Sequence, residues 1–212
     1  FPYTTLFRSM LLAVISYFIV TTKFQYIIHT ICSFLIFKIP YELYKILYWE
    51  MPFGKSGGQL DSILYKNYYK PLQGKEDFIG MLDRFADNAQ IYLSKLLMII
   101  LGLVSEQGAT INTTITLLLF ILFFFFFYFS FKKKNNTMLF IGIYLGTAIG
   151  STFFALQQHW GQLRLILIYM PLIILFFSYG IVELSRIKSF KILQIVLVFV
   201  LCLICIKSLK TT

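Results

Sequence analysis

Charged residues are scarce in this chain of 212 residues. Asp, Glu, Lys and Arg together make up 13% of the sequence, whereas 58% of it is hydrophobic. A soluble domain carries about a quarter charged residues, so a chain this apolar cannot cover itself with polar surface. Its apolar runs are continuous and do not alternate with polar residues, which argues against a β-barrel. We therefore predict an all-α fold, a polytopic transmembrane helix bundle of about five to six spans.

Acidic residues are fewer than basic ones, with nine Asp and Glu against 19 Lys and Arg. The resulting charge of +10 does not indicate nucleic-acid binding, because much of it lies in short loops between apolar runs, as in Lys132–Lys134 and Arg186–Lys191. This is the positive-inside pattern, which predicts that both loops are cytoplasmic. We expect the lipid bilayer as a partner, no nucleic acid, and a location in a bacterial inner (plasma) membrane.

Residues that hold metals or attack substrates are also rare. The three cysteines, Cys32, Cys202 and Cys205, lie inside apolar runs and are interpreted as small apolar helix residues, which predicts neither a metal site nor a disulfide framework. The sequence has no HExxH, GxSxG or dinucleotide-binding motif, and the GKSGG stretch at Gly54–Gly58 lacks the spacing of a phosphate loop. We therefore expect no cofactor, and no catalytic residue can be assigned.

The first nine residues, FPYTTLFRS, read back codon by codon as TTT CCC TAC ACG ACG CTC TTC CGA TCT. This resembles a common sequencing adaptor translated in frame. We expect residues 1–9 to be an assembly scar and exclude them from reasoning about the fold. The chain is then expected to be the C-terminal part of a longer protein.

Three regions follow the first nine residues. Residues 10–51 are predicted to form one or two membrane helices, and Pro40 is expected to break or kink the second. Residues 52–111 are predicted to be an extracytoplasmic loop that contains an amphipathic surface helix over Glu76–Leu103. Residues 112–212 are predicted to be C-terminal membrane helices, including spans over Ile115–Phe131, Met138–Leu156 and Leu165–Val182.

The surface helix carries Asp83, Arg84 and Asp87. Charges on an amphipathic helix are usually its solvated face, and we favour that interpretation over a binding site. Whether Ile91–Leu103 crosses the membrane is left open by its length.

Two compositional features mark the C-terminal helices. The phenylalanine run Phe123–Phe127 needs only lipid to explain it. Gly142, Gly146 and Gly150 recur every four residues, which is typical of a helix face that neighbouring helices approach closely.

The polar stretch that ends at Arg164 is the main candidate site. A guanidinium at the start of a membrane helix is costly unless it reaches water or holds an anion, and its fork suits a phosphate. Trp160 could stack on a sugar, and His159 and Gln162 could bind hydroxyl groups. The alternative is a Trp–Arg anchor at the membrane interface. In the preceding loop, Lys66 and Tyr69 could contact a lipid phosphate or a sugar, or simply lie on headgroups.

Four features of the sequence form a pattern. They are the alternating spans, the polar loop after a proline-containing helix, the surface helix, and the turn Trp160-Gly-Gln-x-Arg164 that leads into LILIYMPLIILFFSYG. This pattern resembles the C-terminal half of bacterial GT-C class membrane glycosyltransferases, relatives of the dolichyl-phosphate-mannose–protein mannosyltransferases and of aminoarabinose transferases. The resemblance implies sugar transfer from a polyprenyl-phosphate carrier to an acceptor on the outer face. It implies Arg164 and Lys66 for the carrier phosphate, and Tyr69, His159 and Trp160 for the sugar. It also implies a catalytic Asp or Glu in a first outer loop that this sequence does not contain.

Two other functions remain open. An O-antigen polymerase or ligase would have a long outer loop rich in arginine, whereas Pro52–Ala109 contains only Arg84. A transporter or flippase would have polar residues in mid-span and paired broken helices. Apart from His29, the predicted spans carry no charged or histidine side chain in mid-span.

Overall fold

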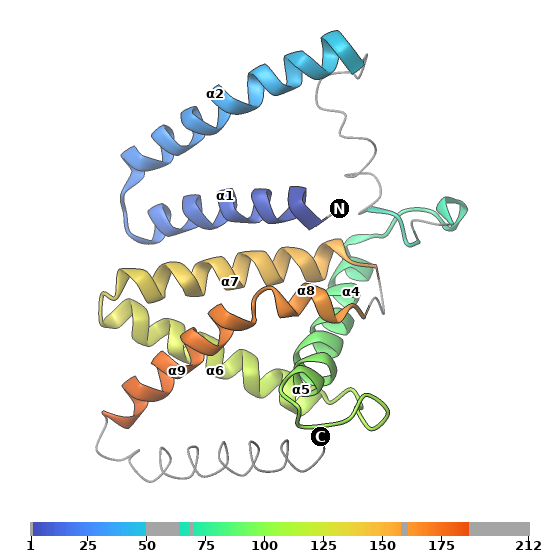
Figure 1. Ribbon diagram of the computed structural model, residues 1–212, viewed down its shortest axis with the longest axis vertical. Coiled ribbons are helices and arrows are strands. Elements are labelled where there is room, and N and C mark those ends of the chain that lie inside the picture. The colour runs from blue at the N-terminus through green and yellow to red at the C-terminus, as the bar shows by residue number, and fades with distance from the viewer. Residues whose placement is uncertain (1, 50–63, 68–69, 158–160, 187–212) are drawn as a thin grey trace.

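The computed structural model describes residues 2–49, 64–67, 70–157 and 161–186 of the chain. Within these residues every named element is a helix, which confirms the all-α class (Figure 1). The elements are α1 (Pro2–Val20), α2 (Phe24–Trp49), η1 (Pro71–Gln73), α4 (Phe78–Gln90), η2 (Ile91–Leu96), α5 (Leu97–Ile100), α6 (Thr113–Lys132), α7 (Asn136–Ala155), α8 (Leu163–Leu167) and α9 (Met170–Ser185).

Three helices in the described part of the chain are long and apolar enough to cross a membrane. They are Phe24–Tyr48 within α2, the whole of α6 and the whole of α7. Two shorter apolar helices, Ser9–Val20 and Met170–Ser185, accompany them. These helices support a membrane protein, and the count of five to six spans stays a prediction.

Helix α1 begins at Pro2, so it includes most of the segment that we attribute to an adaptor. Its described side chains pack on α7, where Ala13 is buried with Leu139 and Ile143. The origin of residues 1–9 stays a prediction.

Helix α2 runs through Pro40 as one helix, so the predicted break is wrong, and the alternative of a kink stays a prediction. It diverges from α1 as it leaves the turn between them (Figure 1). Most of its described side chains are exposed. Phe37, for example, has an exposed fraction of 80%.

The turn between α6 and α7 is formed by the predicted basic loop. Lys134 has a φ of 52°, a left-handed conformation that reverses the chain. The side chain of Asn135 then accepts the backbone N–H of Met138 at 3.2 Å and caps α7. Asn112 caps α6 in the same way through the N–H of Ile115 at 3.2 Å.

The core between α6, α7 and α9 is built from phenylalanine rings that pack on glycines. Phe126 is buried, and its ring occupies the space that a side chain at Gly180 would need. Gly142 faces the rings of Phe127 and Phe176, whereas nothing lies within 4 Å of a Cβ at Gly150. The phenylalanine run therefore has a protein-facing side, and lipid alone does not explain it.

Helices α4, η2 and α5 form one continuous helical segment over Phe78–Ile100 that runs steeply to the axis of α7 (Figure 1). It packs near the end of α7 through an aromatic cluster in which the ring of Phe85 lies 5.6 Å from Phe153 and 4.6 Å from Phe154. That this segment lies on the membrane surface stays a prediction.

The predicted span Leu165–Val182 is divided into α8 and α9. Pro171 has no N–H, so it cannot donate to the carbonyl of Leu167, and the helix is irregular at Ile168 and Tyr169. The chain changes direction at this point (Figure 1).

Candidate functional site

The bundle has two chemically different ends. One carries the α1–α2 turn, the α6–α7 turn and the last residues of α9, with Lys23, Lys132–Lys134 and Arg186, and we call it the basic end (Figure 1). The other carries α4, the end of α7 and the start of α8, and we call it the α4 end. Lys133 Nζ lies 3.8 Å from Glu183 Oε2, so the first of the two predicted basic loops contacts the end of α9.

The predicted residues Gln162 and Arg164 lie at the α4 end and contact each other. Arg164 Nε donates to Gln162 Oε1 at 3.0 Å. The backbone N–H of Gln162 donates to the Tyr92 hydroxyl at 3.2 Å. Gln162 makes no side-chain cap for α8, so its amide oxygen is available for the arginine.

Arg164 is exposed, and its charge is not neutralised by a neighbouring acid in the described part of the chain. Ion pairs in that part of the chain include those of Arg84 with Glu76 and of Lys133 and Arg186 with Glu183. The Arg164 guanidinium is therefore oriented by a neutral amide and keeps its full positive charge for an anion.

Lys66 lies on a short hairpin that precedes α4. Its backbone N–H donates to the carbonyl of Gly74 at 3.1 Å, and the N–H of Glu76 donates to the carbonyl of Leu64 at 2.7 Å. Gly74 has a φ of +83°, which favours glycine at this turn. The Lys66 side chain is exposed. Three further predicted residues, Tyr69, His159 and Trp160, lie outside the described residues.

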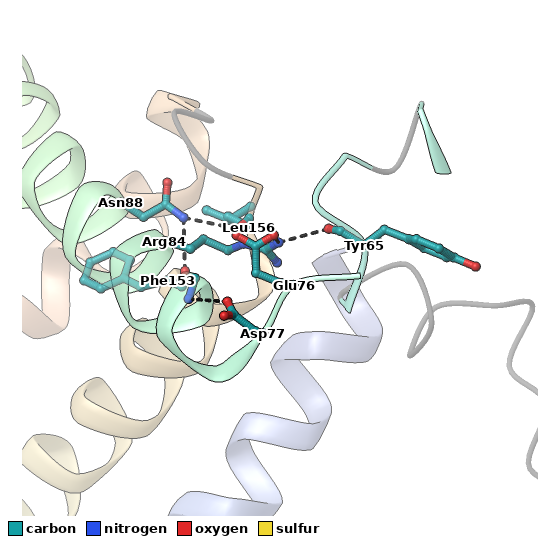
Figure 2. A network of polar contacts seen from close by, with 8 residues as sticks. Tyr65, Glu76, Asp77, Arg84, Asn88, Phe153 and Leu156 are labelled. Atoms are coloured by element: carbon teal, nitrogen blue, oxygen red, sulfur yellow. Dashed lines mark hydrogen bonds and ion pairs between the residues drawn. The ribbon is translucent and has the colours of Figure 1, made fainter. Parts of the chain in front are cut away.

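Arg84 holds this hairpin against α4 (Figure 2). Its Nη2 donates to the carbonyl of Tyr65 at 2.9 Å and lies 3.6 Å from Glu76 Oε2. The side chain is 1% exposed, so the interpretation of Arg84 as part of a solvated face is wrong. A buried guanidinium must be paired, and here it pairs with the hairpin rather than with water.

Asn88 lies one helical turn beyond Arg84 and contacts the end of α7 (Figure 2). Its amide nitrogen donates to the carbonyls of Phe153 at 3.0 Å and of Leu156 at 3.1 Å. The last carbonyls of a helix lack partners within the helix, so the fully buried Asn88 side chain satisfies two of them.

Tyr92 lies one further turn along, where the helix widens in η2. Its side chain is 1% exposed. Burial raises the pKa of Tyr92 above its ordinary value of 10.0, and the hydrogen bond from the Gln162 backbone acts in the opposite direction. The phenol therefore stays neutral at physiological pH.

Sequence reasoning missed the connection among Arg84, Asn88 and Tyr92. They recur every four residues, so they form one polar stripe along the helix, and that spacing is the signal that could have found them. The stripe holds the Lys66 hairpin at one end and the Gln162–Arg164 turn at the other. Eight residues of helix rise about 12 Å, so two predicted cationic segments are attached to one scaffold without contacting each other directly.

A small, mostly apolar pocket lies beneath the Gln162–Arg164 turn. Its walls come from η2, α7, α8 and the α8–α9 junction: Tyr92, Ile149, Thr152, Phe153, Leu165, Ile166 and Tyr169. In the part of the chain that the structure describes, no group of three or more His, Cys, Asp and Glu side chains is placed to hold a metal ion.

The acidic residues near the hairpin have structural contacts. Glu76 pairs with Arg84, and the side chain of Asp77 caps α4 by accepting the N–H of Gly80 at 2.8 Å. Among the described residues, the chemistry at the α4 end is that of an exposed cation set on a buried polar scaffold. Comparison of the chain with protein-family models, with curated proteins and with solved structures found no match.

Proposed function

We propose that this chain is part of an integral membrane glycosyltransferase that moves a sugar from a polyprenyl-phosphate carrier to an acceptor on the outer face. The observation that carries the proposal is the exposed Arg164, oriented by Gln162 at 3.0 Å and not neutralised by any acid among the described residues. A guanidinium held in this way suits a phosphate that needs two hydrogen bonds from one plane.

The proposed reaction requires charge stabilisation where the sugar–phosphate bond breaks. An acceptor hydroxyl attacks the anomeric carbon, the bond from that carbon to the phosphate oxygen breaks, and the carrier phosphate leaves with an additional negative charge. Arg164 would stabilise that charge as it develops. A carboxylate outside this sequence would take the hydroxyl proton.

The position of Arg164 at the α4 end of the bundle supports a lipid-linked donor. It lies at the start of α8, next to the end of α7 and the steeply inclined α4. A helix that runs across the end of a bundle of apolar helices is typical of the headgroup layer, where the phosphate of a lipid carrier also lies. The buried Arg84 is excluded as a phosphate ligand because its guanidinium already contacts the Tyr65 carbonyl and the Glu76 carboxylate.

The test is sugar transfer by the full-length protein in membrane vesicles, with a panel of radiolabelled polyprenyl-phosphate hexoses and pentoses as donors. Arg164→Gln is expected to lower transfer about 100-fold, as does the loss of one donor from an oxyanion site. Arg164→Lys keeps the positive charge but loses the forked pair of donors, so its transfer rate should lie between those of the unchanged protein and of Arg164→Gln.

Lys132→Gln is the matched control, since it removes an exposed cation at the basic end. It should transfer sugar at the unchanged rate, and all variants should insert into the membrane equally. Unchanged transfer by an inserted Arg164→Gln protein would contradict the proposal.

A transporter is the second candidate, because the structure has two irregular helical segments that line one pocket. These are η2 and the α8–α9 junction, both of which line the same pocket. Irregular helices around a pocket are typical of transporters. Translocation of a polyprenyl-phosphate sugar across vesicles without transfer to any acceptor would favour this candidate.

A further inference from the structure

A buried hydroxyl group at the α4 end connects the interior of the protein to the exposed Arg164. Tyr92 lies on η2 with its ring against Phe153, at 5.7 Å between ring centroids. Its hydroxyl accepts the backbone N–H of Gln162 at 3.2 Å, and Gln162 Oε1 accepts Arg164 Nε at 3.0 Å. Two hydrogen bonds therefore run from a fixed phenol to a guanidinium at the surface.

Helix α8 is packed in the core through Ile166, which is buried, but this packing does not set the direction of the exposed Arg164 side chain. Helix α8 has five residues, and Pro171 leaves the junction with α9 irregular at Ile168 and Tyr169. A short helix with an irregular junction cannot fix the direction of a side chain in its first turn by itself. The bond to Tyr92 anchors the residue immediately before α8, and that residue orients Arg164.

We infer that Tyr92 is a positioning residue for Arg164, which it holds, through Gln162, in the direction that receives the phosphate of a lipid carrier. The inference rests on the proposed function. Tyr92 touches neither the phosphate nor the sugar in this arrangement. Its contribution is to reduce the number of orientations that the guanidinium samples before the ligand arrives.

The experiment measures binding to the purified full-length protein in lipid nanodiscs, with two probes of equal chain length. One probe is polyprenyl monophosphate and the other is the neutral polyprenol. Tyr92→Phe keeps the ring and removes the hydroxyl. It is expected to weaken binding of the monophosphate about 3- to 10-fold, the range of one hydrogen bond, and to leave polyprenol binding unchanged.

The double variant Tyr92→Phe/Arg164→Gln should bind the monophosphate no more weakly than Arg164→Gln alone, because Tyr92 acts only through Arg164. Gln162→Met interrupts the same connection while it keeps the backbone N–H for Tyr92. It should reproduce the loss seen in Tyr92→Phe, and it serves as the test if Tyr92→Phe does not fold.

Ser94→Ala is the matched control on the same helix. Ser94 is also a buried hydroxyl on η2, and it accepts the backbone N–H of Asn112 at 3.0 Å in a different loop. Its loss should lower thermal stability by an amount similar to that of Tyr92→Phe without changing monophosphate affinity.

The outcomes separate the two proposals. If Arg164→Gln binds the monophosphate as well as the unchanged protein does, both the proposed function and the inference fail. If Arg164→Gln weakens binding but neither Tyr92→Phe nor Gln162→Met does, only the inference fails. An equal loss for both probes, or additive losses in the double variant, would also overturn it, since either result shows that Tyr92 acts on the pocket and not through Arg164.

Discussion

Glu183 on α9 and Lys133 in the α6–α7 turn form an ion pair in which only the acid is buried. The Lys133 Nζ to Glu183 Oε2 distance is 3.8 Å, and the two side chains are 54% and 6% exposed. Arg186 reaches the other carboxylate oxygen at 2.7 Å. One buried carboxylate on α9 therefore binds two cations, which remain in contact with solvent, and connects α9 to the α6–α7 turn.

This asymmetry predicts that removing the cations is worse than removing the acid. Glu183→Gln leaves two exposed cations that turn to water, and we expect a loss of at most about 1 kcal/mol. Lys133→Gln/Arg186→Gln leaves a buried carboxylate without compensation, and we expect a loss of about 3 kcal/mol. Thermal unfolding in detergent measures both. A larger loss for Glu183→Gln would contradict this account of the pair.

Gly180→Ala should disrupt the packing of α6 on α9. The added methyl group would occupy the position of the Phe126 ring, and overpacking of this kind costs about 1–3 kcal/mol. Phe126→Leu in the same protein should restore part of the loss, because it removes the ring that the methyl group meets. Gly150→Ala is the control, since a Cβ there has nothing within 4 Å. Equal effects at Gly180 and Gly150 on thermal stability would show that the ring contact is unimportant.

Asn88→Leu should destabilise the junction of α4 with α7. The carbonyls of Phe153 and Leu156 would lose their donor in a buried site, at a cost of about 1–3 kcal/mol. Asn88→Asp should cost more than Asn88→Leu, because a carboxylate would face two carbonyl oxygens. Asp83→Asn changes a side chain on the exposed side of the same helix and should be neutral. Urea unfolding measures all three, and a neutral Asn88→Asp would contradict the capping role.

The elements with a local signal could be predicted from the sequence. The apolar runs indicated the helices, and the Lys–Asn turn indicated where α6 and α7 reverse. The phenylalanine run could not be divided in advance into lipid-facing and protein-facing sides, because every position carries the same side chain. Phe124 is exposed, whereas Phe126 is buried against α9, where Gly180 leaves room for its ring.

The polar scaffold of the site was only partly predictable. A spacing of four residues would have grouped Arg84, Asn88 and Tyr92 on one helix face, but their partners are backbone groups. A carbonyl or an N–H leaves no signature in the sequence, because every residue has one. The prediction of a solvated face for Arg84 was wrong for this reason.

The irregular α8–α9 junction has a mechanical consequence for the molecule. At the basic end α9 is held by the Phe126 ring and by the Glu183 ion pairs, whereas α8 meets it across two residues with incomplete helical bonding. Fewer helical hydrogen bonds connect α8 to α9 than connect successive turns inside α9, so a change in the direction of α8 would break fewer bonds at Ile168 and Tyr169 than anywhere within α9.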